Sequence, residues 1–163
     1  MTSQTPVQIA WVTRDLDATE AVLTTLLGAR KWIRMPDVHF GPDTCVHRGA
    51  PADYHADISL SYAGDTQLEL IAPTRGENIY TEFLDESGPG LHHICVEVAD
   101  AEAFEAALAD AEATAPVVAR GSMPGGMLFA YLAAPTAGVP YLEIAYVSDT
   151  IRAFYDYVKK EQQ

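Results

Sequence analysis

The sequence predicts an α+β fold in which a βαβββ module occurs twice and a helix follows at the C-terminus. Two observations lead to this prediction. A strand, a helix and three further strands are expected twice along the chain in the same order. Four features of the first half also recur in the second half at matching positions. The 163 residues are enough for one good-sized core, or for two small modules that share a core. We therefore treat residues 1–163 as a single domain.

The first module is expected to cover residues 6–74. Residues 7–12, VQIAWV, are typical of a strand, and a helix then begins at its N-cap Asp15 and ends at Gly28. The apolar residues Val22, Leu23, Leu26 and Leu27 form one stripe of this helix. The stretch KWIRM predicts a strand, and a loop rich in Gly, Pro and Asp follows from Pro36 to Asp53. In HADISLSYAGDTQLELIAP, an Ala-Gly-Asp turn separates the last two strands.

The second module is expected over residues 91–147, after a linker with a short helix at 75–90. Its strand LHHICVEV leads into a helix with Asp100 as N-cap, and PVVAR is a short strand. Two more strands, MLFAYLAA and PYLEIAYV, flank the turn PTAGV. Residues 148–163 predict a helix with Phe154, Tyr157 and Val158 on one side, which we interpret as a packing or dimer element.

Composition excludes some classes of partner. The chain has 23 acidic and 10 basic residues and a formal charge of −13, which argues against nucleic acid or an anionic membrane as a partner. The uncharged stretch from Gly121 to Leu142 is interrupted by prolines and glycines, so we interpret it as two buried strands and not a membrane span. Cys45 and Cys95 form no C-x-x-C motif, and the N-terminus lacks the pattern of a secretory signal. These features predict a cytoplasmic protein.

The internal repeat singles out four polar residues. When Gln8 is laid on His93, Asp15 falls on Asp100 and Leu23 on Leu108, and Glu69 corresponds to Glu143. Each glutamate lies in an apolar strand without a Lys or Arg, where burial of its charge is costly. A divalent cation such as Zn²⁺, Ni²⁺, Co²⁺, Mn²⁺ or Fe²⁺ would satisfy both glutamates together with the imidazole and the amide oxygen. The alternative is that both glutamates face solvent on open sheets.

Two adjacent histidines begin the apolar strand GLHHICVEV. Because side chains alternate along a strand, His93 shares one face with Cys95 and Glu97, and His92 is expected on the other face. A lone histidine is more often a hydrogen-bonded core residue than a ligand. The pattern alone leaves both possibilities open for His93.

Four stretches resemble the vicinal oxygen chelate superfamily, which includes glyoxalase I, methylmalonyl-CoA epimerase, extradiol dioxygenases and bleomycin-resistance proteins. They are VQIAWVTRDLD, TQLELIAP, GPGLHHICVEVAD and GGMLFAYLAAPTAGVPYLEI. The resemblance covers roughly residues 6 to 147, in the order expected for the family. It implies that the two modules form a cupped mixed sheet with one metal ion on its inner wall. The implied metal ligands are Gln8, Glu69, His93 and Glu143, with His92 pointing away.

The four implied ligands indicate which members of the superfamily this chain resembles most. Extradiol dioxygenases hold Fe²⁺ with two histidines and one glutamate, and Gln8 at the first position speaks against that chemistry. The four residues resemble the set of eukaryotic-type glyoxalase I, while the stretch from Gly121 to Ile144 is more similar to the epimerase. Glyoxalase I has arginines for the glutathione carboxylates where this chain has Val12 and Pro89, which argues against a glutathione adduct. The epimerase usually has histidine at the position of Gln8.

Both relatives abstract a proton next to a carbonyl group. The resemblance therefore implies a metal-dependent isomerase, epimerase or lyase that acts on a small organic acid or thioester. Glu143 is the implied base, and Asp57 is the second candidate, with His55 on the same face of its strand. Asp57 and His55 could equally be polar residues at the surface of the sheet. In the loop before them, His39, His47 and Arg48 are candidate anchors for an anionic group.

The alternative function is a non-catalytic small-molecule-binding protein of the drug-sequestering kind. Such proteins have a cleft lined by aromatic residues at a dimer interface, which Trp11, Trp32, Tyr62, Phe129 and Tyr141 could supply. A homodimer is expected for either function, because small duplicated modules usually bury more surface when they pair.

Overall fold

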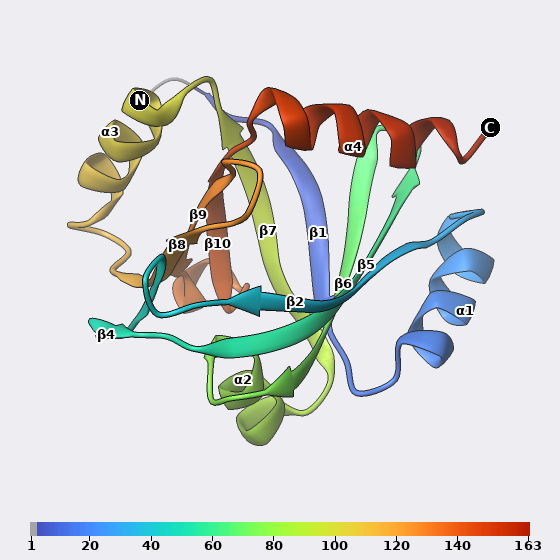
Figure 1. Ribbon diagram of the computed structural model, residues 1–163, viewed down its shortest axis with the longest axis horizontal. Helices are drawn as coiled ribbons and strands as arrows, with labels where there is room; N and C mark the ends of the chain where they lie inside the picture. The colour runs from blue at the N-terminus through green and yellow to red at the C-terminus, as the bar shows by residue number, and fades with distance from the viewer. Residues whose placement is uncertain (1–2) are drawn as a thin grey trace.

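The computed structural model describes residues 3–163 and shows one curved, mixed sheet flanked by helices (Figure 1). The first half contains β1 (Pro6–Val12), α1 (Leu16–Leu27), β2 (Ile33–Phe40), β3 (Cys45–His47), β4 (Ala50–Pro51), β5 (Tyr54–Ala63) and β6 (Thr66–Arg75). Helix α2 (Ile79–Ser87) connects it to the second half, which contains β7 (Gly90–Val98), α3 (Ala101–Ala111), β8 (Val117–Ser122), β9 (Leu128–Ala133) and β10 (Tyr141–Tyr146). A 3₁₀ turn at Pro135–Ala137 precedes β10, and α4 (Asp149–Lys160) is the last element. The α+β class predicted from the sequence is confirmed.

The order of strands in the sheet shows the internal symmetry. It runs β2-β5-β6-β1 through the first half and continues as β7-β10-β9-β8 through the second, so β1 and β7 meet at the centre. These two strands are antiparallel, with Gln8 opposite Cys95 and Ala10 opposite His93. Each also pairs in parallel with the last strand of its own half. The two halves are therefore related as the repeat in the sequence predicts.

The segment from Pro36 to Asp53 is not a simple loop, and this expectation was wrong. Strand β2 continues through Pro36 to Phe40, with an irregular register between Met35 and Val38. An edge strand tolerates a proline there, because the missing N–H has no partner strand to bond. After a turn, β3 pairs with β8 at the far edge of the second half. We call residues 41–52 the strap, because they join the first half to that edge and close the sheet into a cup.

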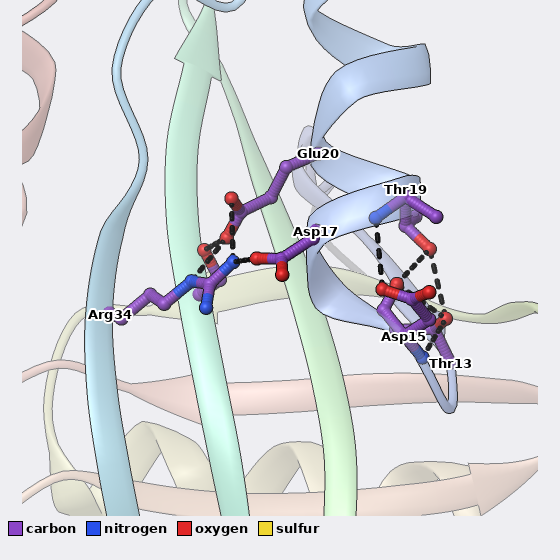
Figure 2. Close-up of polar contacts among 8 residues, drawn as sticks. Thr13, Asp15, Asp17, Thr19, Glu20 and Arg34 are labelled. Atoms are coloured by element: carbon purple, nitrogen blue, oxygen red, sulfur yellow. Dashed lines mark hydrogen bonds and ion pairs between the residues drawn. The ribbon is translucent and has the colours of Figure 1, made fainter.

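Helix α1 ends where the sequence predicts, but most of its apolar stripe is exposed. Asp15 accepts a hydrogen bond from the backbone N–H of Ala18, and Gly28 stops the helix in the left-handed region at φ 76°. Only Leu23 of the stripe is buried, whereas Leu26 is 72% exposed. Polar contacts supply much of the remaining attachment to the sheet: Figure 2 shows Arg34 of β2 paired with Asp17 and Glu20, and Thr13 close to Thr19.

Two apolar clusters hold the layers together. On the outer face, Phe104 and Leu108 of α3 pack against Val96 and Ile144. The larger cluster fills the inside of the cup and includes side chains from α2 and α4. Figure 1 shows α4 lying across the ends of the central strands. Among the described residues, each helix is too short or too polar to cross a membrane, and the uncharged Gly121 to Leu142 stretch forms β9 and β10 as predicted.

The inward side of α4 differs from the predicted one. Tyr155 and Val158 are the buried residues of this helix, while Tyr157 is 48% exposed. A helix that docks along one narrow line buries residues three apart and leaves the flanking apolar positions open. The periodicity identified an amphipathic helix, but the docking angle decided which of its aromatic residues face the cup.

Candidate metal centre

Four polar side chains from the two halves meet on the inner wall of the cup. Nε2 of His93 lies 3.0 Å from Oε2 of Glu143, 3.4 Å from Oε2 of Glu69 and 3.3 Å from Oε1 of Gln8. The strand register explains this meeting, because Glu69 pairs with Ala10 and Glu143 pairs with Cys95, two residues beyond Gln8 and His93 respectively. The structure thus brings together all four residues that the sequence resemblance implied.

The arrangement suits a divalent cation. One ligand atom from each of Glu69, His93 and Glu143 lies within 4.8 Å of the others. Within residues 3–163, the ion pairs of both glutamates are with His93 and not with a lysine or arginine. Two carboxylates, an imidazole nitrogen and an amide oxygen form a donor set for ions such as Zn²⁺, Ni²⁺, Co²⁺, Mn²⁺ or Fe²⁺. The residues therefore fit one metal ion.

Gln67, which was not identified from the sequence, orients Gln8. The amide Nε2 of Gln8 donates to Oε1 of Gln67 over 2.6 Å, and Nε2 of Gln67 donates to Tyr62 Oη over 3.1 Å. This chain of hydrogen bonds uses the donor side of the Gln8 amide and turns its oxygen toward His93. The signal in the sequence is weak: Gln67 lies two residues before Glu69 and so shares its face of β6.

His92 does not point away from His93, and this expectation was wrong. The pairing of β7 with β1 shifts from His93 opposite Ala10 to Leu91 opposite Trp11, which leaves His92 as an extra, bulged residue. A β-bulge interrupts the alternation of side chains and can re-aim one of them. As a result Nδ1 of His92 lies 2.8 Å from Nδ1 of His93, and both rings pack near Tyr131.

The contact between the two histidines defines their protonation. Burial, followed by the charge of His93, holds the pKa of His92 well below its ordinary value, so this ring is neutral. Its Nδ1 then accepts the hydrogen bond from Nδ1–H of His93, which directs Nε2 of His93 at the glutamates. A ligand histidine in a metal site commonly has its second nitrogen held in this way. His92 is thus in a position to orient the candidate ligand.

Electrostatic effects of burial are strong in this centre. Burial alone would lower the pKa of His93, but the hydrogen bonds to Glu143 and Glu69 raise it to about 9. Burial raises the pKa of Glu69 above its ordinary value, against the opposing effect of its hydrogen bond to His93. Without a metal ion, the cluster therefore holds protons that the unfolded chain would release near neutral pH.

The other candidate base, Asp57, is not part of the centre. Leu60 pairs with Glu69 and therefore shares the inner face of β5, so the odd-numbered Asp57 faces the outside of the sheet. There it lines a groove beside Arg14 and Arg34, and its Oδ1 accepts a hydrogen bond from the backbone N–H of Asp37 over 2.8 Å. Its neighbour His55 contacts Asp37 on the same outer side.

The expected anchors in the strap region do not form one anion site. Arg48 and His47 both contact Glu82 of α2, and His39 contacts Asp53. Of the candidate cleft aromatics, Tyr62 and Phe129 belong to the core inside the cup, and Tyr141 packs against it. Trp11 is an odd number of residues from Gln8 on β1 and so lies on the other face of the sheet, and Trp32 donates to Thr24 of α1. These two tryptophans therefore do not line the inside of the cup.

A cavity of about 30 Å³ borders Glu69 and Glu143. Its other walls are mainly aromatic and methionine side chains, including Phe129, Tyr131 and Tyr155. This volume is close to that of one water molecule, whereas ligand sites usually measure roughly 300–1,000 Å³. A cavity of this size has no room for an organic substrate.

Comparison with known proteins agrees with this architecture. The chain belongs to the glyoxalase/bleomycin resistance protein/dioxygenase superfamily, whose family model matches residues 7–131. A comparison with curated proteins found no significant match. The family resemblance inferred from the sequence is confirmed.

Solved structures of methylmalonyl-CoA epimerases share the fold. The enzyme of Mycobacterium tuberculosis is 18% identical, with a TM-score of 0.61 and coverage of 91% of each chain. A methylmalonyl-CoA epimerase in complex with methylmalonyl-CoA and NH₄⁺ is 17% identical, with a TM-score of 0.60 over 91% of this chain and 98% of the other. A variant of the Streptomyces coelicolor epimerase with 2-nitronate-propionyl-CoA is 18% identical, with a TM-score of 0.59 and the same coverage. At these identities the likeness establishes the fold.

The raised pKa values predict how stability of the metal-free protein depends on pH. The pKa of His93 is about 9 in the folded protein and 6.5 in the unfolded chain. The stabilising contribution of its proton is therefore complete below pH 6.5 and is lost as the pH rises to 9. The raised pKa of Glu69 acts in the same direction. We expect the free energy of unfolding, measured with urea and a chelator, to fall by up to about 3 kcal/mol across this range.

In a His93→Gln variant the free energy of unfolding should depend less on pH, because the variant lacks the titrating ring. His47→Gln, which removes a histidine outside the centre, should keep the parent's profile. A parent protein that is equally stable at pH 6.5 and at pH 9 would contradict the assignment.

Proposed function

We propose that this protein is a metal-dependent isomerase, epimerase or lyase that abstracts a proton next to the carbonyl of a small organic acid or thioester. The observation that carries the proposal is the buried cluster in which His93 lies 3.0 Å from Glu143 and 3.4 Å from Glu69, without a lysine or arginine among the ion-pair partners of the two glutamates in residues 3–163. Membership of the superfamily and the likeness to methylmalonyl-CoA epimerases support the same reaction class.

Gln8, Glu69, His93 and Glu143 would hold the ion. When bound, the ion would polarise the substrate carbonyl and so acidify the adjacent C–H bond. The protein's contribution is orientation: Gln67 turns the Gln8 oxygen inward, and His92 fixes the ring of His93. The apolar core around the cluster excludes water, which strengthens each electrostatic interaction inside it.

Glu143 is the proposed base. Glu143 lines the cavity, and its carboxylate would receive the proton and return it to another face or to a neighbouring carbon. Glu69 lines the same cavity from the other half of the sheet, so it is the second carboxylate within reach. Asp57 lies on the outer face of β5, and we no longer propose it as a base.

We propose that α4 moves to admit the substrate. Tyr155 of α4 borders the cavity, and its Oη donates to Sδ of Met127 over 3.5 Å. The helix is held at both ends by polar contacts, because Arg152 pairs with Glu97 and Lys159 pairs with Asp65 over 2.7 Å. Ion pairs that keep part of their surface in solvent, as these do, contribute only about 0–1 kcal/mol each. Opening of α4 would enlarge the cavity beside the metal centre.

Non-catalytic binding of a small molecule is the second candidate function. The apolar lining of the cavity, with Met35, Met123, Met127 and several aromatic rings, favours it, since such side chains adapt to a hydrophobic ligand. This function needs no metal ion, so a metal analysis separates the two candidates. The homodimer and the cytoplasmic location expected from the sequence stay predictions.

Metal uptake is the first test of the proposed function. We expect purified protein reconstituted with Zn²⁺, Ni²⁺, Co²⁺ or Mn²⁺ to retain an ion in the buried centre, measured by elemental analysis after desalting. Glu69→Ala and His93→Ala should lose this ion because each removes a ligand. His92→Phe keeps the ligand but removes the partner of its ring, so its metal affinity should fall by roughly 10- to 100-fold.

Thr25→Ala on the exposed surface of α1 is the matched control and should bind metal like the parent. If the parent retains no ion and the Glu69 and His93 variants are as stable as the parent, the small-molecule-binding function is favoured instead.

Proton exchange is the test of the base. In D₂O, the metal-loaded protein should catalyse deuterium incorporation next to the carbonyl of a 2-substituted acyl thioester or an α-hydroxy carbonyl compound, followed by mass spectrometry. Glu143→Gln keeps an oxygen ligand but removes the base, so metal should largely remain and exchange should drop by at least about 100-fold.

Asp57→Asn should exchange at the parent's rate, because Asp57 faces the outside of the sheet. Loss of exchange in Glu69→Gln, with normal exchange in Glu143→Gln, would move the role of base to Glu69. An absence of metal-dependent exchange with every compound of both classes would reject proton transfer.

Release of α4 is the test of access. The double variant Arg152→Ala, Lys159→Ala removes the two ion pairs and should populate the open position more often. We expect a several-fold faster uptake of Co²⁺ into the buried centre, followed by stopped-flow absorbance. Lys160→Ala removes an exposed charge from the same helix and should leave the rate unchanged. Equal rates in all three proteins would show that ions reach the centre by another path.

A further inference from the structure

A second cluster of possible metal ligands lies on the outer side of the sheet, where β2 and β5 pair. His39 and His55 are directly opposite each other across these strands, and their rings stack with centroids 4.3 Å apart. Nε2 of His39 lies 2.6 Å from Oδ1 of Asp53. One ligand atom from each of these three residues lies within 4.8 Å of the others. The cluster shares no residue with the buried centre.

We propose that His39, Asp53 and His55 form a second site for a divalent ion such as Zn²⁺. Two imidazoles and one carboxylate are a donor set that Zn²⁺ accepts, with water in the remaining position. The proposal does not depend on the function proposed for the buried centre.

Asp37 orients His55 for this role. Oδ1 of Asp37 lies 2.7 Å from Nδ1 of His55, so Nδ1–H donates to it and Nε2 is left as the nitrogen available to a metal ion. A carboxylate behind a ligand histidine is the usual outer partner in metal sites. Asp37 adopts the left-handed backbone conformation at φ 53°, which is uncommon for a residue other than glycine. Asp57 holds this conformation by accepting the backbone N–H of Asp37.

The charge of the surroundings suits a divalent cation. Three carboxylates gather there, from Asp37, Asp53 and Asp57, and the neighbouring cation on β6 is Arg75, which pairs with His55 in the strand register. With neutral histidines, Asp37, Asp53 and Arg75 together carry a charge of −1, while Asp57 shares its groove with Arg14 and Arg34. The hydrogen bond to His39, together with the charges of the basic neighbours, lowers the pKa of Asp53, which keeps this carboxylate ionised. A bound Zn²⁺ would compensate the negative charge of the carboxylates.

The place of the cluster in the fold indicates what the ion would do. His39 precedes the strap and Asp53 directly follows it, so the site lies at the two ends of residues 41–52. The strap carries β3 to the edge of the second half, where Cys45 pairs with Gly121 and His47 with Ala119. An ion bound at its base would hold the two ends together and stabilise the segment that closes the cup.

The test uses a chain without the buried centre. In the His93→Ala variant, isothermal titration with Zn²⁺ should still show one ion per chain, bound at the cluster of His39, Asp53 and His55. The additional change His39→Gln or His55→Gln should abolish this binding. Asp37→Asn should weaken it by roughly 10- to 100-fold, because the ring of His55 loses its partner. Adding His47→Gln to His93→Ala removes a histidine of the strap outside the cluster, and this double variant should bind Zn²⁺ like His93→Ala alone.

The role as a clamp has its own measurement. Zn²⁺ should slow tryptic cleavage after Arg48, an exposed residue of the strap, in His93→Ala but not when His39→Gln is added to it. If His93→Ala does not fold, Glu69→Ala serves as the background. The site is rejected if the background variant takes up no Zn²⁺, or if uptake persists without His39 and His55. Zn²⁺ binding that leaves cleavage after Arg48 unchanged would reject the clamp.

Discussion

The antiparallel pairing of β1 with β7 is the constraint on which the rest of the structure depends. It places Gln8 opposite Cys95 and Ala10 opposite His93, so the two halves meet at the middle of one continuous sheet. Each half then adds its last strand in parallel, with Glu69 and Glu143 at equivalent positions. Because the sheet curves around this junction, residues far apart in the sequence share one inner wall.

The inner wall buries charged side chains whose burial is costly unless they interact with one another. Two glutamates and a histidine lie in an apolar core, where isolated charges are strongly disfavoured. Without a metal ion, the two carboxylates raise the pKa of His93 to about 9. The ring is therefore protonated near neutral pH, and its charge partly compensates theirs. Gln67 and His92 hold the remaining polar atoms in defined orientations. An ion at the same place would satisfy the carboxylates without that proton.

Two segments that lie outside the repeated strands close the cup. The strap crosses from the first half to the edge strand β8, and α4 lies across the ends of the central strands (Figure 1). Tyr155 and Val158 of α4 are buried in the core, and partly exposed ion pairs add to the attachment of this helix. The base of the strap carries contacts between histidine and aspartate side chains. In the proposed function the sheet positions the metal ligands and α4 controls access to them, and in the proposed second site an ion holds the base of the strap.

The sequence by itself determined the class of fold, the helix ends at Asp15 and Gly28, and the equivalence of Gln8 with His93 and of Glu69 with Glu143. These follow from local rules: capping, alternation, and repetition along the chain. Tertiary structure alone decided that His92 joins His93, because a bulge against β1 breaks the alternation, and that Asp57 lies outside, because β6 sets which face of β5 turns inward. It also decided that β3 forms at the edge of β8 and that Tyr155 of α4 faces the cup. Such outcomes depend on pairing between distant segments, whose register and docking angle no local pattern records.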